Sequence, residues 1–201
     1  MTATALTSPD LVVSIADLWL PILIATIAVF FLSMIAWTVA PHHKPEARPM
    51  GDERSLFSII KSQPIAPGAY YFPYCDAADM KTDEGKRRYA EGPWGRLVVY
   101  PKRPSMGASL LGSFLLYLVV SVLLAYLGSV TIVAGAEFAH VMRVIGVGAF
   151  LAYTTAVMPQ IIWFDRRWPV FFAHLFDGVV YALATGAAFG LLWPALSVPS
   201  V

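Results

Sequence analysis

Four long apolar stretches divide this chain, and almost no Lys or Arg interrupts them. They cover residues 18–40, 108–128, 139–164 and 169–194. Each is longer than the roughly 20 residues that a helix needs to cross the hydrocarbon core of a bilayer. Because backbone groups inside lipid must bond within their own segment, such stretches are expected to be helices. The sequence therefore predicts an all-α membrane protein, a bundle of four transmembrane helices.

The composition supports this interpretation. Of the 201 residues, 58% are hydrophobic and 13% are charged, whereas soluble globular domains average about 45–50% and about 25%. The first stretch has no cationic residue before it and is longer than the apolar region of a secretory signal peptide. We therefore interpret it as a retained helix.

The positions of the cations predict the orientation of the bundle. Of the 14 Lys and Arg residues, eleven lie in residues 41–107 and two, Arg166 and Arg167, lie between the last two stretches. Cytoplasmic loops of membrane proteins retain Lys and Arg. Residues 41–107 are therefore expected in the cytoplasm, and both terminal segments, 1–17 and 195–201, are expected outside.

Residues 41–107 are expected to form a small α+β insertion between the first two helices. Apolar residues at helical spacing predict a short helix over 52–63. Residues 69–74 and 97–100 are rich in aromatic and β-branched side chains and predict two strands. The insertion has eleven cations and eight acids, a mixture that is not typical of a nucleic-acid surface. No nucleic-acid partner is expected.

Catalytic motifs are missing from the sequence. The chain has no phosphate-binding glycine loop, no dinucleotide fingerprint, no His-Glu-x-x-His and no paired cysteine motif. Ser58 and Lys61 match Ser-x-x-Lys, but the companion motifs of that chemistry are absent. We therefore expect a protein that is not an enzyme and that carries no cofactor.

Ionisable residues in or beside the apolar stretches are the candidate functional groups. These intramembrane polar candidates are Asp17, His140, Arg143, His174 and Asp177. An ionisable residue inside a membrane helix indicates a functional site by default, and Asp177 lies about two turns into the fourth stretch. Asp177 either takes part in transport or proton relay, or, as we favour, pairs with Arg166, Arg167, His174 or a Tyr from a neighbouring helix. At the outer end, either an Asp17–Arg143 ion pair or a bond from Arg143 to phosphate is the simplest expectation.

The histidines suggest a metal or haem site at the inner end. His42 and His43 end the first stretch there, and His174 and Asp177 share a helix face because they are three residues apart. Imidazole and carboxylate ligands suit a divalent ion, so these four residues form a candidate metal site. No known ligand spacing is present, and contacts with lipid headgroups are the favoured interpretation. His140 lies roughly 36 Å along the helix axis from the inner boundary, too far to share a haem with His174.

The fourth stretch also has a stripe of small residues. Gly178, Ala182, Gly186 and Gly190 recur every four residues along it. Such stripes allow two helix backbones to approach closely. The stripe is expected either to pack against the third stretch, which we favour, or to bind a partner.

Six short motifs distributed over most of the chain form a recognisable set. They are Pro67-Gly68-Ala69-Tyr70, Gly92-Pro93, Met106-Gly107, Ile162-Trp163-Phe164, Asp177-Gly178-Val179-Val180-Tyr181 and Phe189-Gly190-Leu191-Leu192-Trp193-Pro194. In these motifs the chain resembles an uncharacterised family of bacterial four-span inner-membrane proteins. The resemblance implies a multi-pass protein of the bacterial inner (plasma) membrane, and it implies no activity, substrate or cofactor.

The function that these observations favour is an accessory, scaffold or assembly subunit of a larger membrane-protein complex. Its expected partners are the lipid bilayer and another membrane protein or further copies of the chain. One alternative is a small homo-oligomeric transporter or ion or proton channel that uses Asp177, with a path opened where Pro159 breaks the third helix. A second alternative is a metal or haem protein that uses the inner-side histidines.

Overall fold

The computed structural model describes residues 11–63, 65–165 and 167–196, and these residues are mostly helical with one small sheet. The chain divides into two compact units, which are described separately below. Unit 1 comprises residues 1–48 and 107–201, and unit 2 comprises residues 49–106. The expected outer segments 1–17 and 195–201 lie partly outside the described residues, and Arg166 lies wholly outside them.

Unit 1 is built around four helices that are long and apolar enough to cross a membrane, as the sequence predicted. The first is α1 (Trp19–Thr38), which follows the 3₁₀ turn η3 (Ala16–Leu18), and the second is α4 (Met106–Thr131). The third consists of α5 (Phe138–Thr155), α6 (Met158–Gln160) and the π-helical turn η6 (Ile161–Asp165), and the fourth is α7 (Trp168–Leu191). Their ends differ from the predicted stretches by at most three residues.

The third helix is interrupted between α5 and α6. Proline has no backbone N–H, and its ring clashes with the carbonyl group four residues earlier in a continuous helix. For Pro159 that carbonyl belongs to Thr155, the last residue of α5. Pro159 instead lies in the first turn of α6, where proline is tolerated. The expected break at Pro159 is therefore observed.

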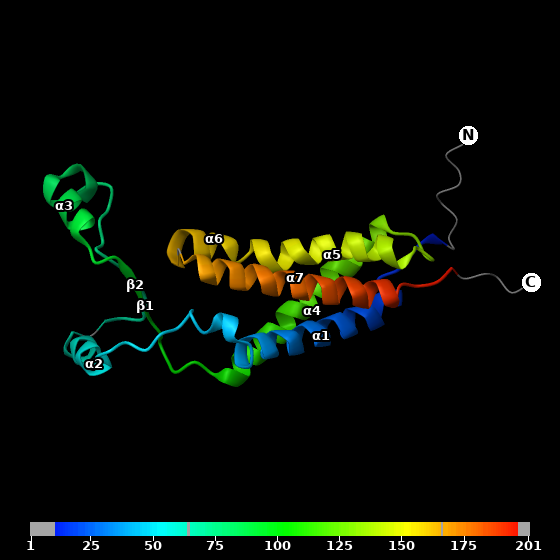
Figure 1. Cartoon of the computed structure of the whole chain (residues 1–201), viewed down its shortest axis with the longest axis horizontal. Helices are drawn as coiled ribbons and strands as arrows, with labels where there is room; N and C mark the ends of the chain where they lie inside the picture. Colours follow the sequence, from blue (N-terminus) through cyan, green and yellow to red (C-terminus); the bar gives the residue numbers. More distant parts are fainter. Residues whose placement is uncertain (1–10, 64, 166, 197–201) are drawn as a thin grey trace, which may run out of the picture. The chain divides into compact units, whose positions relative to one another are not determined.

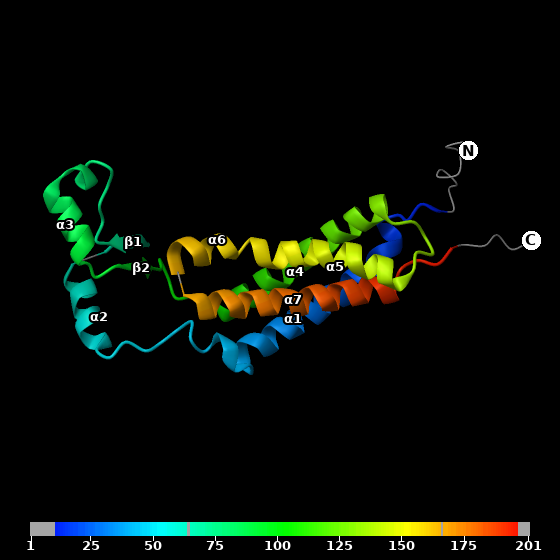
Figure 2. The ribbon, with the colours of Figure 1, turned by 45° about the horizontal axis from the view of Figure 1, so that its top comes forward.

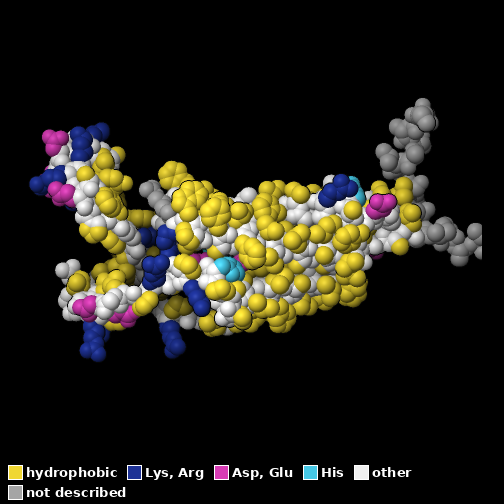
Figure 3. Space-filling model, in the orientation of Figure 1, with side chains coloured by type: hydrophobic (Ala, Val, Ile, Leu, Met, Phe, Trp, Pro, Cys, Tyr) yellow, Lys and Arg dark blue, Asp and Glu magenta, His cyan; other side chains and the backbone are white. Residues whose placement is uncertain are grey.

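The helices of unit 1 share one apolar core. α7 lies alongside α5 and also against α1 (Figures 1 and 2). Buried members of the core come from all four helices, for example Ala25, Leu124, Ile145 and Phe189. Most other apolar side chains of these helices are exposed, and hydrophobic residues cover the visible surface along their length (Figure 3). A surface of this kind is consistent with a multi-pass membrane protein.

The small-residue stripe of α7 packs inside the chain. A Cβ atom added at any of its three glycines would collide with a side chain of α5. The closest distances would be 2.1 Å from Gly178 to Thr154, 2.8 Å from Gly186 to Met142 and 2.7 Å from Gly190 to Phe138. The fourth member, Ala182, is buried. The stripe therefore allows α5 and α7 to approach each other, which is the interpretation that the sequence favoured.

Unit 2 is a small α+β module, as predicted. Its helices are α2 (Glu53–Ser62) and α3 (Asp83–Glu91). The short 3₁₀ turn η5 (Asp79–Lys81) lies directly before α3. Asp52 caps α2 and Thr82 caps α3 by accepting hydrogen bonds from backbone N–H groups of the first turn. Strands β1 (Gly68–Phe72) and β2 (Gly95–Val99) form an antiparallel pair, and β2 begins two residues earlier than expected.

Candidate functional site

The segment after α1 folds back on itself because of one proline. Ala40 is extended, the conformation that a following proline favours, and this ends the helix. Pro41 then opens the 3₁₀ turn η4 (Pro41–His43), in which His42 and His43 are neighbours. The backbone N–H of Glu46 donates to the carbonyl group of His43 at 3.0 Å. This second turn returns the Glu46 side chain to His43.

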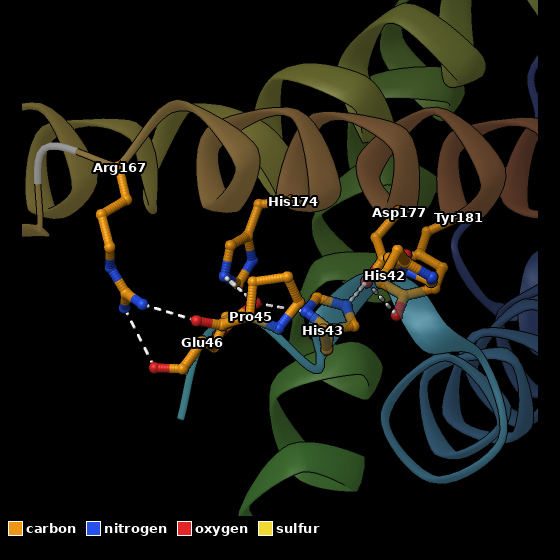
Figure 4. A network of polar contacts seen from close by, with 8 residues as sticks. All are labelled: His42, His43, Pro45, Glu46, Arg167, His174, Asp177 and Tyr181. Atoms are coloured by element: carbon orange, nitrogen blue, oxygen red, sulfur yellow. Dashed lines mark hydrogen bonds and ion pairs between the residues drawn. The ribbon is translucent and has the colours of Figure 1, made fainter. Parts of the chain in front are cut away.

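Arg167, directly before α7, holds this segment in place. Its guanidinium group donates to the backbone carbonyl groups of Pro45 at 2.6 Å and Glu46 at 3.0 Å (Figure 4). Both acceptors lie more than 120 residues from Arg167 in the sequence. The contact therefore attaches the segment after α1 to the beginning of α7.

Asp177 of α7 is the centre of the resulting cluster. Its carboxylate is buried, with 5% of the residue exposed. Nε2 of His42 lies 2.8 Å from Oδ1, and Nε2 of His43 lies 2.7 Å from Oδ2 (Figure 4). The hydroxyl group of Tyr181, one turn further along α7, donates to Oδ2 at 3.3 Å. Three side chains from two distant segments thus converge on one buried acid.

His43 connects this acid to a second one. Its Nδ1 atom forms a hydrogen bond with Oε1 of Glu46, and the same oxygen lies 3.3 Å from Nε2 of His174. The indole ring of Trp37 stacks on the His43 imidazole with 4.1 Å between ring centroids. We call His42, His43, Glu46, His174 and Asp177 the His–Asp cluster.

The surroundings of His43 change its pKa. Burial lowers the pKa of this imidazole, but the hydrogen bonds from its two nitrogens to Glu46 and Asp177 raise it, and the net effect is a raised pKa. The carboxylates on both sides favour the imidazolium form because each accepts one of its two N–H groups. The His43 imidazole thus lies between two acids, both of which stabilise its protonated form.

Two overlapping groups of side chains in the cluster have ligand atoms close enough to share a metal ion. The first is His42, His43 and Asp177, and the second is His43, Glu46 and His174. Imidazole nitrogen and carboxylate oxygen are ligands of Zn²⁺ and of other first-row divalent ions. Ligand atoms around tetrahedral Zn²⁺ lie about 3.3 Å apart. In the first group the two imidazole nitrogens contact different oxygens of the Asp177 carboxylate, at 2.8 and 2.7 Å, and the ligand atoms all lie within 4.8 Å of one another.

The two groups differ in the role that suits them. The first has two buried members, His43 and Asp177, and offers three ligand atoms. Glu46 then contacts the opposite nitrogen of His43. Metal-binding histidines usually donate their second N–H to a carboxylate, which fixes the orientation of the ring. The geometry therefore fits a metal site whose ligands are the first group. Glu46 supports the ligand His43 through its hydrogen bond, and His174 in turn contacts Glu46.

The sequence identified four of the five cluster residues. His42, His43, His174 and Asp177 were the candidate metal site, and the structure brings them together. The partners suggested for Asp177 were Arg166, Arg167, His174 or a Tyr of a neighbouring helix. The hydrogen bonds observed for its carboxylate instead come from His42, His43 and Tyr181, and Tyr181 lies on the same helix as Asp177. Glu46 was missed as a site residue. Its position three residues after His43, in a segment with a turn-forming proline, was the available signal.

Within the described residues, the candidates at the other end of unit 1 do not form a comparable site. Asp17 accepts hydrogen bonds from the backbone N–H of Ser14 at 2.9 Å and from its hydroxyl group at 2.7 Å. Nε of Arg143 donates to the carbonyl group of Ala139 at 3.0 Å, and His140 is exposed. The expected Asp17–Arg143 ion pair is therefore wrong, because each side chain bonds within its own segment instead.

Comparison of the chain with protein-family models, with curated proteins and with solved structures gave no match. The features of the chain that bear on function are thus the four apolar helices and the chemistry of the His–Asp cluster. Among these, the cluster is the feature that a purely structural bundle would not need, because burying charged groups is costly.

Proposed function

We propose that this protein is a four-span membrane protein that binds a divalent transition-metal ion, Zn²⁺ by preference, at the His–Asp cluster. The observation that carries the proposal is the convergence of His42, His43 and Asp177. Nε2 of each histidine lies 2.7–2.8 Å from an oxygen of the Asp177 carboxylate, although 134 residues separate His43 from Asp177. Two of the three residues are buried.

The proposed arrangement in the membrane makes the site cytoplasmic. The cluster lies where α1 ends and α7 begins, at the end of the helices from which residues 41–107 leave the bundle. Those residues carry eleven of the 14 cations, so cytoplasmic placement follows from the retention of Lys and Arg on that side. The termini are then outside, and the membrane is the bacterial inner membrane.

The number of ligands favours a site that exchanges its ion. Structural zinc sites usually have four protein ligands, whereas sites with three leave a position for water or for an incoming group. His42, His43 and Asp177 are three, and His42 is only partly buried. This suits an accessory protein that receives and releases a metal ion, the role that we propose for the chain within a membrane-protein complex.

Passage of the ion through a single chain has less support. Toward the outer end, the space between the helices is filled by Leu18, Ile145 and Phe189, each with 0% of its surface exposed. A path for ions or protons requires polar groups or water along its length. We therefore propose binding and exchange on the cytoplasmic face, and not transport.

Metal binding is tested on the full chain purified in a mild detergent. The protein is treated with a chelator, dialysed, and titrated with Zn²⁺ by calorimetry, and Co²⁺ then serves as a spectroscopic probe of coordination by nitrogen and oxygen. We expect one ion per chain. The double variant His42→Ala/His43→Ala should lose binding, whereas the matched variant His140→Ala, at the exposed histidine, should keep it.

A wild-type chain that binds neither ion would refute the proposal. So would a double variant that binds Zn²⁺ as tightly as the wild type. The orientation is tested separately with fusions to alkaline phosphatase, which is active only outside the cytoplasm. A fusion after Val201 should be active and one within residues 41–107 inactive, and the reverse result would place the cluster on the outer face.

A further inference from the structure

A groove of about 320 Å³ lies between α5 and α7 in unit 1, and it shares no residue with the His–Asp cluster. Its floor is formed by Gly146 and Ala182, two positions without a long side chain. Val147, Val179 and Leu183 line its sides and are exposed. The groove is therefore apolar, and it opens on the surface that faces lipid in the proposed membrane arrangement.

The groove exists because α5 and α7 do not close on each other at this level. At Gly178, Gly186 and Gly190, an added Cβ atom would lie 2.1–2.8 Å from a side chain of α5. At Gly146, an added Cβ atom would meet the backbone carbonyl oxygen of Ala182 at 3.8 Å, which is an ordinary van der Waals contact. The space beside Gly146 can therefore receive a group from outside the chain.

Arg143 lines the end of the groove that is nearest to the beginning of α5. It is the only Lys or Arg in the four apolar stretches of the sequence. Its Nε atom donates to the carbonyl group of Ala139, the second residue of α5. This bond holds the guanidinium group back toward the helix end, where a long cationic side chain reaches the headgroup region. Within the described part of the chain, Arg143 forms no ion pair.

The charge at this end of the groove suits an anion. A guanidinium group binds phosphate oxygens through paired N–H donors. The helix α5 begins five residues before Arg143, so the positive end of its dipole also favours a negative charge there. A phosphate group beside Arg143 and a hydrocarbon chain in the groove together describe a phospholipid.

A helix of a partner protein or of a second copy would suit the groove less well. It would cover Arg143 and remove water from a charge that has no acid to pair with, which is costly. A phospholipid leaves the guanidinium group among the headgroups and supplies the missing negative charge. The volume of the groove lies at the small end of the roughly 300–1,000 Å³ of ligand pockets, so it receives part of a lipid and not a whole one.

We propose that the groove between α5 and α7 binds one acyl chain of an anionic phospholipid whose phosphate group is bound by Arg143. From Arg143 to Phe150 the groove follows the helix for about 10 Å, so it holds the upper part of the chain, and the remainder stays in the bilayer. This inference rests on the proposed membrane arrangement and is independent of the metal ion.

The test uses the full chain, purified in detergent and stripped of lipid. Dioleoylphosphatidylglycerol is titrated, and bound lipid is counted by native mass spectrometry. Dioleoylphosphatidylcholine, which has no net charge, and dioleoylglycerol, which has no phosphate, are compared with it. We expect one phosphatidylglycerol per chain, bound more tightly than either. Arg143→Gln should weaken binding about fivefold, the effect of one cation near a membrane surface. Arg103→Gln, at an exposed cation of unit 2, should leave it unchanged.

A second pair of variants tests the location without removing a charge. Gly146→Leu fills the groove from a position where a Cβ atom is tolerated, and it should abolish the tight binding. Gly112→Leu, on α4 with nothing within 4 Å, should keep it. Treatment with a chelator should also leave lipid binding unchanged, which separates this site from failure of the metal site.

Four results would overturn the assignment. One is equal affinity for phosphatidylglycerol and either comparison lipid, and another is unchanged affinity in Gly146→Leu. A third is an equal loss in Arg143→Gln and Arg103→Gln, which would mean that the lipid responds to total charge alone. The last is a chain that forms a dimer which Gly146→Leu dissociates, because the groove would then be an interface between helices.

Discussion

The two ends of unit 1 carry the same kinds of polar residue but are built differently. At one end, His42 and His43 reach Asp177 across more than 130 residues of sequence, and His43 and Asp177 are buried. At the other end, Asp17 and Arg143 bond to residues three or four positions away and stay exposed. Residue type alone therefore does not identify a site. Convergence from separate segments, together with burial, distinguishes the two ends.

Desolvation explains why this difference matters. An exposed ion pair contributes little, because water already solvates both charges. A buried charge is costly unless it is paired and hydrogen-bonded, so every group in the His–Asp cluster depends on the others. A metal ion can replace the protons of such a cluster, and the same exchange offers no advantage at the exposed end.

Replacing the acid at each end should produce the largest difference between the two ends. Asp177→Asn removes the charge that two imidazoles contact, so Zn²⁺ affinity should fall more than about 100-fold, and stability should fall by about 3–5 kcal/mol. Asp17→Asn should change neither property measurably. Calorimetric titration and thermal unfolding of both variants provide the measurements. Equal losses in the two variants would remove the distinction between the ends.

The supporting carboxylate should have the next largest effect. Glu46→Gln keeps the size of the side chain but weakens its contact with His43, so Zn²⁺ affinity should fall about 10–100-fold, as for other groups behind a metal ligand. Glu137→Gln, at the exposed acid before α5, is the matched control and should bind normally. Normal binding by Glu46→Gln would mean that Glu46 does not orient His43.

Packing beside the cluster should affect stability by a smaller amount. Gly178→Ala places a methyl group 2.1 Å from Thr154, which should lower the free energy of unfolding by about 1–3 kcal/mol. Gly112→Ala, on α4 with nothing within 4 Å, should raise it by up to about 1 kcal/mol because alanine favours helix. Unfolding in mixed detergent measures both. A stable Gly178→Ala variant would show that α5 and α7 separate at this point without cost.

The metal-free protein should respond to pH through His43. Because its pKa is raised above the ordinary 6.5, the stability that the imidazolium form contributes is complete below pH 6.5 and is lost as the pH rises through the raised value. Tm should therefore fall over that range. In contrast, Zn²⁺ affinity should rise, since the ion displaces a proton. His43→Gln should abolish the dependence of Tm on pH, and a pH profile that His140→Gln alters equally would contradict this assignment.

The smallest expected effect belongs to the arginines. Arg167→Gln loses the donors to the carbonyl groups of Pro45 and Glu46, so the segment after α1 is held less firmly. Zn²⁺ affinity should fall less than about tenfold, because the ligands themselves remain. Arg143→Gln removes a contact within one helix turn and should leave the affinity unchanged. The ratio of the two dissociation constants is the measurement.

Much of the architecture could be predicted because its causes are local. Runs of apolar residues specify the four helices, the proline at position 159 ends α5, and the glycine spacing indicated the face of α7 that α5 covers. The Asp17–Arg143 pair was expected because both residues lie near the outer end of their apolar stretches. It does not form, because each side chain has a nearer partner in its own segment and no need to cross to another helix.

The sequence by itself determined the four apolar helices, the α+β insertion and the histidines and acid that had to be considered. Hydrophobic periodicity and backbone sterics act over a few residues, so they can be read along the chain. Only the tertiary structure decided that Glu46 belongs with these residues, that Asp177 contacts His42 and His43, and that His140 has no part in the cluster. Those contacts depend on where a turn after α1 meets α7, and that meeting is set by the packing of whole helices.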